Sequence, residues 1–331
     1  MTGSTTLATR LLAPGPAVTA DAVRIWASGG LVAFPTETVY GLGADATNGA
    51  AVARIYEAKG RPAFNPLISH VTGMNAARQL ARFDAAAARL AEAFWPGPLT
   101  LVLPKTENCT VSELATAGLD SIAVRVPQHP VAQDLLAAFG RPVVAPSANR
   151  SGHVSPTTAT HVRADLMGRI DLIVDGGATP VGLESTIVGC LDEPTLLRPG
   201  GVPREAIERV LGRALAEPST IGITIEDAPL APGMLASHYA PRSRMRLEAE
   251  RVAPGEALLA FGPVTIAGAD KATKTLNLSA RGDLIEAAAN LFSHLRALDA
   301  AGASTIAVMP LPRDGLGEAI NDRLQRAAAP R

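Results

Sequence analysis

The sequence predicts an α/β protein with two folded parts, and three observations support this prediction. The chain has 331 residues, which corresponds to about two domains at roughly 100–200 residues each. Hydrophobic residues make up 47% of the chain and charged residues 18%, so it can bury large cores and is not globally disordered. Short apolar runs alternate with helical patterns over the first two-thirds, and a smaller alternation follows near the C-terminus.

The elements of the first part follow in chain order. Residues 21–28 predict a short helix that ends at two glycines, and residues 31–35 predict a buried strand that ends at a proline. Residues 85–94 predict a helix that a Pro-Gly-Pro sequence stops, and residues 203–210 predict one with proline in its first turn and glycine after its end. Further strands are predicted in the apolar runs LTLVLP, SIAVRVP, RPVVAP, DLIVD and STIVGC.

The periodicity fails between residues 213 and 243, where prolines alternate with apolar side chains. This stretch is either a linker that packs on a surface or an ordinary ordered loop. Beyond it, strands in EALLAFG, KTLNLS and STIAVMP alternate with helices over residues 283–300 and 317–328, which predicts parallel strand pairing. We therefore expect a main domain over residues 1–212, an ordered linker over 213–243 and a small α/β domain over 244–331. No G-x-G-x-x-G motif follows a strand in the small domain, so its sequence does not support nucleotide binding there.

Charge and composition exclude several classes of protein. The formal net charge is -1, which argues against an extended nucleic-acid surface but allows a local basic cleft. No apolar run approaches the roughly 18 residues that span a bilayer, and the N-terminus predicts a short disordered leader rather than a secretory signal. Cys109 and Cys190 form no metal-type pair or disulfide framework, which fits buried thiols in a reducing compartment, the cytoplasm.

Four cations are candidates for anion binding. Lys59 and Arg61 begin the segment KGRPAFNPL, which reads as a loop that could neutralise a phosphate chain or a carboxylate; a solvated surface pair is the alternative. Arg125 interrupts an apolar strand, which is costly unless the guanidinium meets an anion, either a substrate carboxylate or a structural partner. Arg198 in LRPGG adds a fourth cation.

Three segments rich in Ser, Thr and Asn border predicted strands: residues 34–47 (FPTETVYGLGADAT), 145–157 (APSANRSGHVSPT) and 182–189 (GLESTIVG). The first is expected to leave a strand and enter a glycine-broken turn. Hydroxyl and amide groups at strand ends suit phosphate oxygens or a hydrated Mg²⁺, although strand capping or a hydrophilic connection would give the same pattern. His70 between apolar residues is more typical of a structural group, and His238-Tyr239 would be lid residues if the linker packs over a site.

The chain contains no Ser-His-Asp order, no cysteine-nucleophile context, no H-E-x-x-H motif and no Walker A loop. The inventory therefore indicates binding and electrostatic catalysis on an anionic, phosphorylated ligand rather than covalent catalysis.

Taken together, the motifs resemble one family. In chain order, PTETVYGLG, KGRPAFNPL, AVRVP, PSANRSGHVSPT, ESTIV and LRPGG resemble the YrdC-like threonylcarbamoyl-AMP synthases. PGMLASHYAP followed by a small α/β domain resembles the long form of that enzyme, so the likeness covers nearly the whole chain. It implies a twisted open sheet with helices around a basic cleft, plus a small Rossmann-like C-terminal domain.

The resemblance also implies an activity, that of an L-threonylcarbamoyladenylate synthase, a nucleotidyltransferase. Members of the family make L-threonylcarbamoyl-AMP and pyrophosphate from L-threonine, bicarbonate or CO₂, and ATP, with Mg²⁺ expected to enter on the ATP phosphates. A separate threonylcarbamoyl transferase complex then modifies the adenosine next to the anticodon in tRNAs that read codons beginning with A.

The site residues carried over by the resemblance form three groups. The nucleotide and phosphate tetrad, with the first two as catalytic residues, is Lys59, Arg61, Ser147 and Asn149. Further nucleotide contacts are Asn65, Ser121, Ser155, Arg198 and Tyr239, where position 121 keeps a hydroxyl although many relatives have Thr. Threonine contacts are Thr36, His70, Arg125, Ala145 and Ser185. The linker is expected to fold back over the cleft, with Tyr239 stacking on or bonding the nucleotide.

Two other functions stay open at this point. The first is a non-catalytic RNA-binding module that uses the same basic cleft, against which the charge balance and the 4% aromatic content argue. The second is a carbamoyl-transfer domain for metallocentre assembly, against which the absence of cysteine clusters argues.

Overall fold

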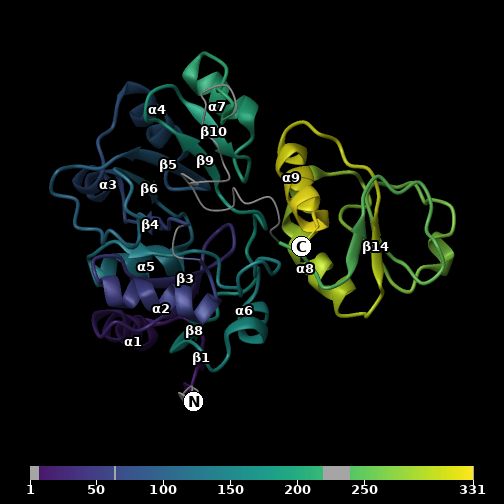
Figure 1. Ribbon diagram of the computed structural model, residues 1–331, viewed down its shortest axis with the longest axis horizontal. Coiled ribbons are helices and arrows are strands. Elements are labelled where there is room, and N and C mark those ends of the chain that lie inside the picture. The colour runs from purple at the N-terminus through teal and green to yellow at the C-terminus, as the bar shows by residue number, and fades with distance from the viewer. Residues whose placement is uncertain (1–6, 63–64, 219–238, 331) are drawn as a thin grey trace.

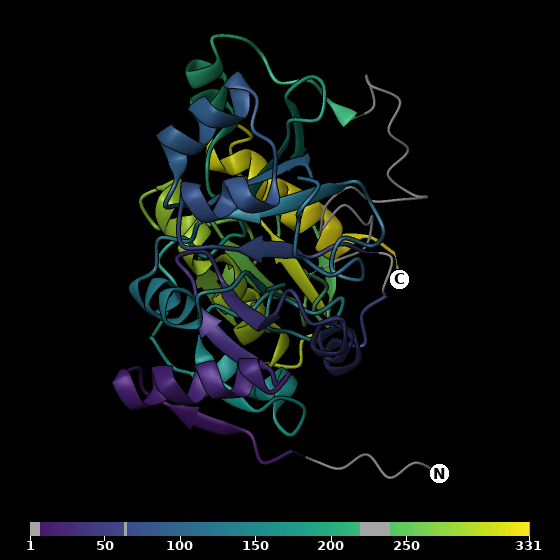
Figure 2. The ribbon, with the colours of Figure 1, turned by 90° about the vertical axis from the view of Figure 1, so that its left-hand side faces the viewer.

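The protein folds into two lobes, each built on its own β-sheet (Figure 1). The structure, a computed structural model, describes residues 7–62, 65–218 and 239–330. Residues 1–6 of the predicted leader lie outside the described residues, and so do residues 219–238 of the predicted linker, including His238 of the predicted lid. Figure 2 views the molecule from the side of the first lobe, so that the second lobe lies behind it.

The first lobe contains, in chain order, β1 (Arg10–Leu12), α1 (Pro16–Ala27), β2 (Val32–Pro35), β3 (Tyr40–Asp45), α2 (Gly49–Lys59), β4 (Ile68–His70), α3 (Met74–Leu80), α4 (Ala85–Phe94), β5 (Leu99–Pro104), β6 (Ser121–Arg125), α5 (Pro130–Phe139), β7 (Val143–Val144), α6 (Ala159–Leu166), β8 (Leu172–Val174), β9 (Thr186–Gly189), β10 (Thr195–Arg198) and α7 (Arg204–Leu211). The second lobe contains β11 (Arg244–Arg246), β12 (Ala257–Ala260), the 3₁₀ turn η2 (Ala269–Lys271), β13 (Thr275–Asn277), α8 (Leu284–Asp299), β14 (Thr305–Val308) and α9 (Leu316–Ala328).

The first lobe is organised by a ten-stranded mixed sheet with the order β1-β8-β2-β3-β7-β4-β6-β5-β9-β10. Strands that are far apart in sequence become neighbours in it: β4 pairs with both β6 and β7, and β5 pairs with β9. The apolar runs predicted as strands all contribute to this sheet. Because the polar segments of the sequence border these strands, the sheet order decides which of those segments meet.

One predicted turn is a strand. The segment of residues 34–47 was expected to leave a strand and enter a turn, but it forms β3, which pairs with β2 and β7 inside the sheet. The glycines that suggested a turn allow close packing instead: a Cβ on Gly43 would lie 2.7 Å from the Phe34 ring and 2.9 Å from the Trp26 ring. Trp26 also donates a hydrogen bond to the Gly43 carbonyl at 2.9 Å. Glycine is therefore required here by two aromatic neighbours rather than by a turn.

The predicted loop from Lys59 to Leu67 begins one residue later than expected. Lys59 is the last residue of α2, a helix whose N-terminus is capped by the Asn48 side chain. Gly60 ends this helix in the left-handed conformation, with a φ of 61°. A helix end is a more rigid support than a loop, so the position of Lys59 is fixed by packing. The first helix, α1, begins at Pro16 rather than at the predicted residue 21, because proline suits a first helical turn.

The second lobe is a four-stranded sheet with the order β11-β14-β12-β13, and all its pairs are parallel, as the sequence predicted. Helices α8 and α9 cover the face of this sheet that looks toward the first lobe (Figure 1). The core of this lobe continues into the first one, because Val39, Val154 and Leu183 belong to the same buried cluster as the apolar residues of α8 and α9. Among the described helices, none combines the length and apolarity that a bilayer crossing needs.

Candidate active site

A small cavity of about 50 Å³ lies in the first lobe where several strand ends meet. Its lining combines three arginines with hydroxyl groups, a histidine and a glutamate. The lining residues are Thr38, Val39, Arg61, Ile68, His70, Arg125, Ala145, Pro146, Ser147, Glu184, Ser185, Arg198 and Tyr239. Residues predicted to contact the nucleotide and residues predicted to contact threonine thus border one space.

Strand register explains why these residues converge. His70 ends β4 directly beside Arg125, which ends the parallel neighbour β6. Ala145 and Ser147 follow β7, which pairs with β4 on its other side. Ser185 comes directly before β9, and Arg198 is the last residue of β10, which pairs with β9. In open α/β sheets ligands bind at such strand ends.

Arg61 brings a buried positive charge to the cavity. Its Nη2 lies 3.5 Å from the Asn65 carbonyl and 3.4 Å from the Pro66 carbonyl, and its buried Nε has no hydrogen-bond partner among the described residues. Burial lowers the pKa of Arg61 to about 10. A guanidinium that is removed from water and incompletely hydrogen-bonded favours binding of an anion.

Lys59 does not line the cavity, but its side chain contacts the loop that contributes Ser147 to the lining. Its Nζ donates hydrogen bonds to the carbonyls of Ser147 and Asn149, both at 2.5 Å. These contacts tie the end of α2 to the loop that follows β7. Burial, together with repulsion by Arg61, holds the pKa of Lys59 well below its ordinary value.

Arg125 makes a buried ion pair with Glu37, with 2.5 Å between Nη2 and Oε1. This is the structural partner that the sequence left open as an alternative. Glu37 lies in the motif PTETVYGLG, in the segment of residues 34–47 whose polar groups border a predicted strand. Burial alone would raise the pKa of Glu37, but Arg125 and the backbone N–H of Gln128 lower it below its ordinary value. The Nε of Arg125 is buried without a partner among the described residues, so one donor remains for a ligand.

His70 is a neutral hydrogen-bonding group. Burial, and then the neighbouring Arg125, lower its pKa to about 3. Its Nδ1 lies 3.1 Å from the carbonyl of Ile68, and since a carbonyl can only accept, Nδ1 carries the proton. Nε2 is then an acceptor, which suits a ligand N–H or O–H.

Arg198, Ser185 and Glu184 form one connected wall of the cavity. Arg198 Nη2 donates to the Ser185 carbonyl at 2.8 Å, and the Ser185 hydroxyl lies 2.7 Å from the hydroxyl of Thr100. Glu184 accepts a hydrogen bond from Ser155 at 2.5 Å. Ser155 was predicted as a nucleotide contact. In the structure its hydroxyl donates to Glu184 Oε1, and Ser155 does not line the cavity.

Tyr239 closes the cavity on the side of the second lobe. Its ring is buried and stacks on Phe292 of α8, with 5.7 Å between the ring centres. Its φ of 64° lies in the left-handed region, which is unusual for a residue other than glycine. Strain of this kind persists where the surrounding packing fixes the residue.

The remaining predicted residues lie around the cavity or away from it. Thr36 donates to the Val39 carbonyl at 2.7 Å and shapes the β2–β3 turn. Asn65 and Asn149 are buried, and neither side-chain oxygen has a partner among the described residues. Ser121 lies at the opposite end of β6 from Arg125, about 13 Å away at the usual rise of a strand. It therefore does not border this cavity.

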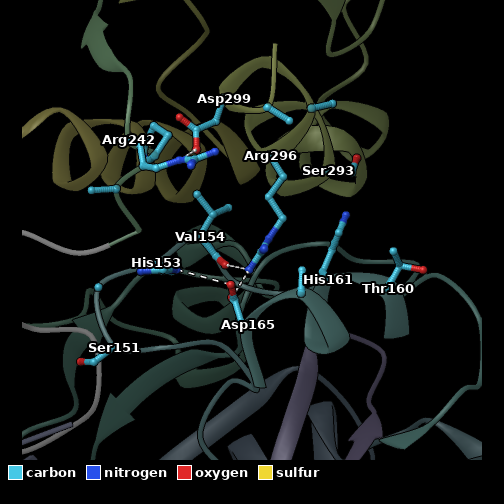
Figure 3. Close-up of a pocket in the computed structure, with 16 residues that line it drawn as sticks. Ser151, His153, Val154, Thr160, His161, Asp165, Arg242, Ser293, Arg296 and Asp299 are labelled. Atoms are coloured by element: carbon cyan, nitrogen blue, oxygen red, sulfur yellow. Dashed lines mark hydrogen bonds and ion pairs between the residues drawn. The ribbon is translucent and has the colours of Figure 1, made fainter. Parts of the chain in front are cut away.

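A larger cavity of about 740 Å³ lies between α6 and α8 (Figure 3). Its charged side chains face one another: Asp165 accepts from Arg296 at 2.7 Å and lies 3.4 Å from His153, and Arg242 lies 3.4 Å from Asp299. Because these charges are paired with one another and the Arg296–Asp165 pair joins α8 to α6, we interpret this cavity as part of the interlobe contact.

The side chains of the small cavity do not fit a metal ion of their own. Its carboxylate, Glu184, is paired with Arg323, and the adjacent Glu37 is paired with Arg125. Among the described residues, no group of three or more His, Cys, Asp or Glu side chains is placed to hold a metal. The expectation that Mg²⁺ enters on the ATP phosphates stays a prediction.

Comparison with known proteins identifies the family. Residues 24–200 match the Sua5/YciO/YrdC family, whose description reads "Telomere recombination", and this match covers more than half of the chain. The chain belongs to the Sua5/YciO/YrdC family. Residues 202–329 match a second family, described as "Threonylcarbamoyl-AMP synthase, C-terminal domain".

Relatives in this family match along most of their length. A threonylcarbamoyl-AMP synthase of Pyrococcus abyssi is 44% identical over 318 residues, which cover 91% of each chain. One of Bacillus subtilis is 42% identical over 315 residues, covering 91% of this chain and 90% of that protein. The crystal structure of P. abyssi Sua5 complexed with L-threonine matches with a TM-score of 0.85 and 40% identity, covering 97% of both chains. The predicted family and fold class are confirmed, and the relatives carry the predicted enzyme name.

Proposed function

We propose that this protein synthesises L-threonylcarbamoyl-AMP and pyrophosphate from L-threonine, bicarbonate or CO₂, and ATP. The observation that carries the proposal is the convergence of Arg61, Arg198 and Ser147 with Arg125, His70 and Ser185 on one buried cavity. The names of the relatives and the threonine complex of P. abyssi Sua5 support the same activity.

The threonine end of the cavity is formed by the pair of strand ends that carry His70 and Arg125. The Nε of Arg125, which has no partner within the described part of the chain, can donate to the amino-acid carboxylate. His70 stays neutral and offers Nε2 as an acceptor to a hydroxyl or N–H of the substrate. A group with a pKa of about 3 is a poor general base, so His70 orients the substrate rather than removing its proton.

The nucleotide end uses electrostatic stabilisation. The carbamate oxygen of N-carboxythreonine attacks the α-phosphorus of ATP, the bond from that phosphorus to the bridging oxygen breaks, and pyrophosphate leaves with the electron pair. Arg61 and Arg198 can hold the charge that develops on the phosphate oxygens. Mg²⁺ bound to the ATP phosphates would add charge neutralisation. Because the carbamate is already anionic, the step requires no general base.

A closed site is required because both the carbamate and the mixed anhydride react with water. The arginines that line the cavity are less than 10% exposed, and Tyr239 is 1% exposed. The formal net charge of -1 and the 4% aromatic content argue against the RNA-binding alternative, which needs an extended basic surface. The product would then serve a separate transferase complex in the cytoplasm that modifies tRNA next to the anticodon, as the family resemblance implies.

A pyrophosphate-release assay with ATP tests this function. Threonine and bicarbonate are added separately and together, and the threonylcarbamoyl-AMP product is identified by mass spectrometry. We expect release to require both additions. Release that proceeds at the same rate without threonine would overturn the assignment.

A further inference from the structure

We propose that Arg323, on the last helix of the second lobe, is a positioning residue of the active site. It holds Glu184 as a neutralised carboxylate, so that this carboxylate does not compete with the nucleotide phosphates for Arg61 and Arg198. The inference rests on the proposed function and assigns the second lobe a part in it.

Arg323 reaches across the lobe junction. It lies on α9, which faces the first lobe (Figures 1 and 2), and its side chain is completely buried. Arg323 lies three residues after Ile320 and one residue before Leu324, both of which belong to the core of the second lobe. An arginine at such a position is costly unless its charge is paired and its N–H groups are hydrogen-bonded.

Each end of the Arg323 guanidinium has an acceptor. Its Nε donates to Glu184 Oε2 at 2.8 Å, its Nη2 to the Pro199 carbonyl at 2.9 Å, and its Nη1 to Asp322 at 2.5 Å. Its guanidinium carbon also lies 5.2 Å from the centre of the Tyr239 ring. Three of these four contacts are with segments that carry predicted site residues.

Glu184 is the group whose charge Arg323 controls. Both carboxylate oxygens are occupied, one by Arg323 and the other by Ser155, and the residue lines the cavity beside Arg198. Without Arg323, a buried negative charge would remain in a cavity that is to bind a polyanion. That charge would attract Arg198 and repel the phosphates, so ATP would bind more weakly.

The same contacts of Arg323 also fix two neighbouring chain segments relative to each other. The Glu184–Ser185 segment and the LRPGG segment approach so closely that a Cβ on Gly200 would lie 2.4 Å from the Glu184 carbonyl oxygen. Arg323 bonds the Glu184 side chain on one segment and the Pro199 carbonyl on the other. It therefore also fixes Ser185 and Arg198, which are adjacent to these two residues.

A general role in docking the lobes would produce a different pattern. Docking is served by a second ion pair between the same helix and the first lobe, Arg204 Nη2 to Glu318 Oε1 at 2.6 Å, whose side chains are 23% and 28% exposed. Neither residue lines the small cavity. Glu318→Gln therefore weakens docking without changing the charge at the site and is the matched control for Arg323→Gln.

The test compares Arg323→Gln, Arg323→Lys, the double variant Arg323→Gln/Glu184→Gln, and Glu318→Gln. For Arg323→Gln we expect the KM for ATP to rise at least about tenfold while the KM for threonine changes much less. Removing the Glu184 charge in the double variant should recover most of that loss. Arg323→Lys, which keeps the charge, should lie between the wild type and Arg323→Gln. Glu318→Gln should leave both KM values within about twofold.

Equilibrium binding of α,β-methylene-ATP provides a readout that does not need turnover, and melting temperatures show that each variant is folded. An unchanged KM for ATP in Arg323→Gln, a double variant no better than the single one, or an equal effect of Glu318→Gln would each overturn the inference. If the wild type releases no threonine-dependent pyrophosphate, the proposed function fails instead, and binding of the analogue still decides the role of Arg323.

Discussion

The two cavities of this protein both contain arginines, but their charges are balanced differently. In the larger cavity, Arg296 is paired with Asp165 of the opposite lobe, and Arg242 is paired with Asp299 of its own lobe. Positive and negative charges therefore match there. In the smaller cavity, Arg61 has no carboxylate partner among the described residues, and Glu184 is already neutralised by Arg323. The comparison teaches that an excess of buried positive charge, rather than cavity size, marks the place where an anion binds.

The largest expected effect comes from removing this excess charge. Arg61→Ala should lower the rate of pyrophosphate release on the order of a hundredfold, equivalent to about 3 kcal/mol of transition-state stabilisation. The melting temperature of the ligand-free variant should stay the same or rise, because burial of Arg61 is not compensated by a carboxylate among the described residues. Steady-state kinetics and thermal unfolding measure the two effects.

A loss of activity together with a clear loss of stability would contradict this view of Arg61. It would mean that Arg61 stabilises the fold and that the charge excess of the small cavity has no functional meaning.

The histidines of the two cavities give a second, smaller difference, in the pH dependence of stability. Burial lowers the pKa of His70 to about 3, whereas an unfolded histidine has a pKa of about 6.5. The stability that this group contributes is therefore fully present above pH 6.5 and is lost as the pH falls from there toward 3. Between pH 7 and pH 5 the loss from His70 is about 2 kcal/mol.

His70→Gln should flatten the pH dependence of the free energy of unfolding in that window, as measured by denaturant titration. His161 of the larger cavity has a pKa lowered to about 4 by burial, and then by Arg296, but it is only partly buried. His161→Gln should therefore flatten the curve less. Identical slopes for the wild type and His70→Gln would show that His70 is not buried as a neutral group.

Local sequence patterns predicted much of the fold and of the site. Apolar runs between polar segments marked the strands, and the cations in KGRPAFNPL, AVRVP and LRPGG marked three arginines that do meet at one cavity. Prediction failed where distant neighbours decide the structure. The glycines of β3 read as a turn, because nothing local indicates that Phe34 and Trp26 pack against Gly43.

Local sequence patterns also could not predict the carboxylate partners of the buried arginines, because those partners are distant in the sequence. Arg125 and Glu37 are 88 residues apart, and Arg323 and Glu184 are 139 apart, so only the sheet order and the lobe contact bring them together. One signal was available: Ile320, Arg323, Leu324 and Ala327 follow the spacing of a buried helix face. An arginine on such a face predicts a buried partner, although it does not say which one.

The smallest expected effect concerns the exposed pair of the larger cavity. The Arg242 side chain is 84% exposed, and its Nε lies 3.4 Å from Asp299, so solvent screens most of the attraction between them. Arg242→Ala should change the rate of pyrophosphate release by less than about twofold and the melting temperature by only a degree or so. The same kinetic and thermal measurements used for Arg61→Ala apply, which makes the two variants a matched arginine-to-alanine pair. If Arg242→Ala lowered activity as strongly as Arg61→Ala, charge balance would not distinguish the two cavities, and the larger one would also have to take part in the reaction.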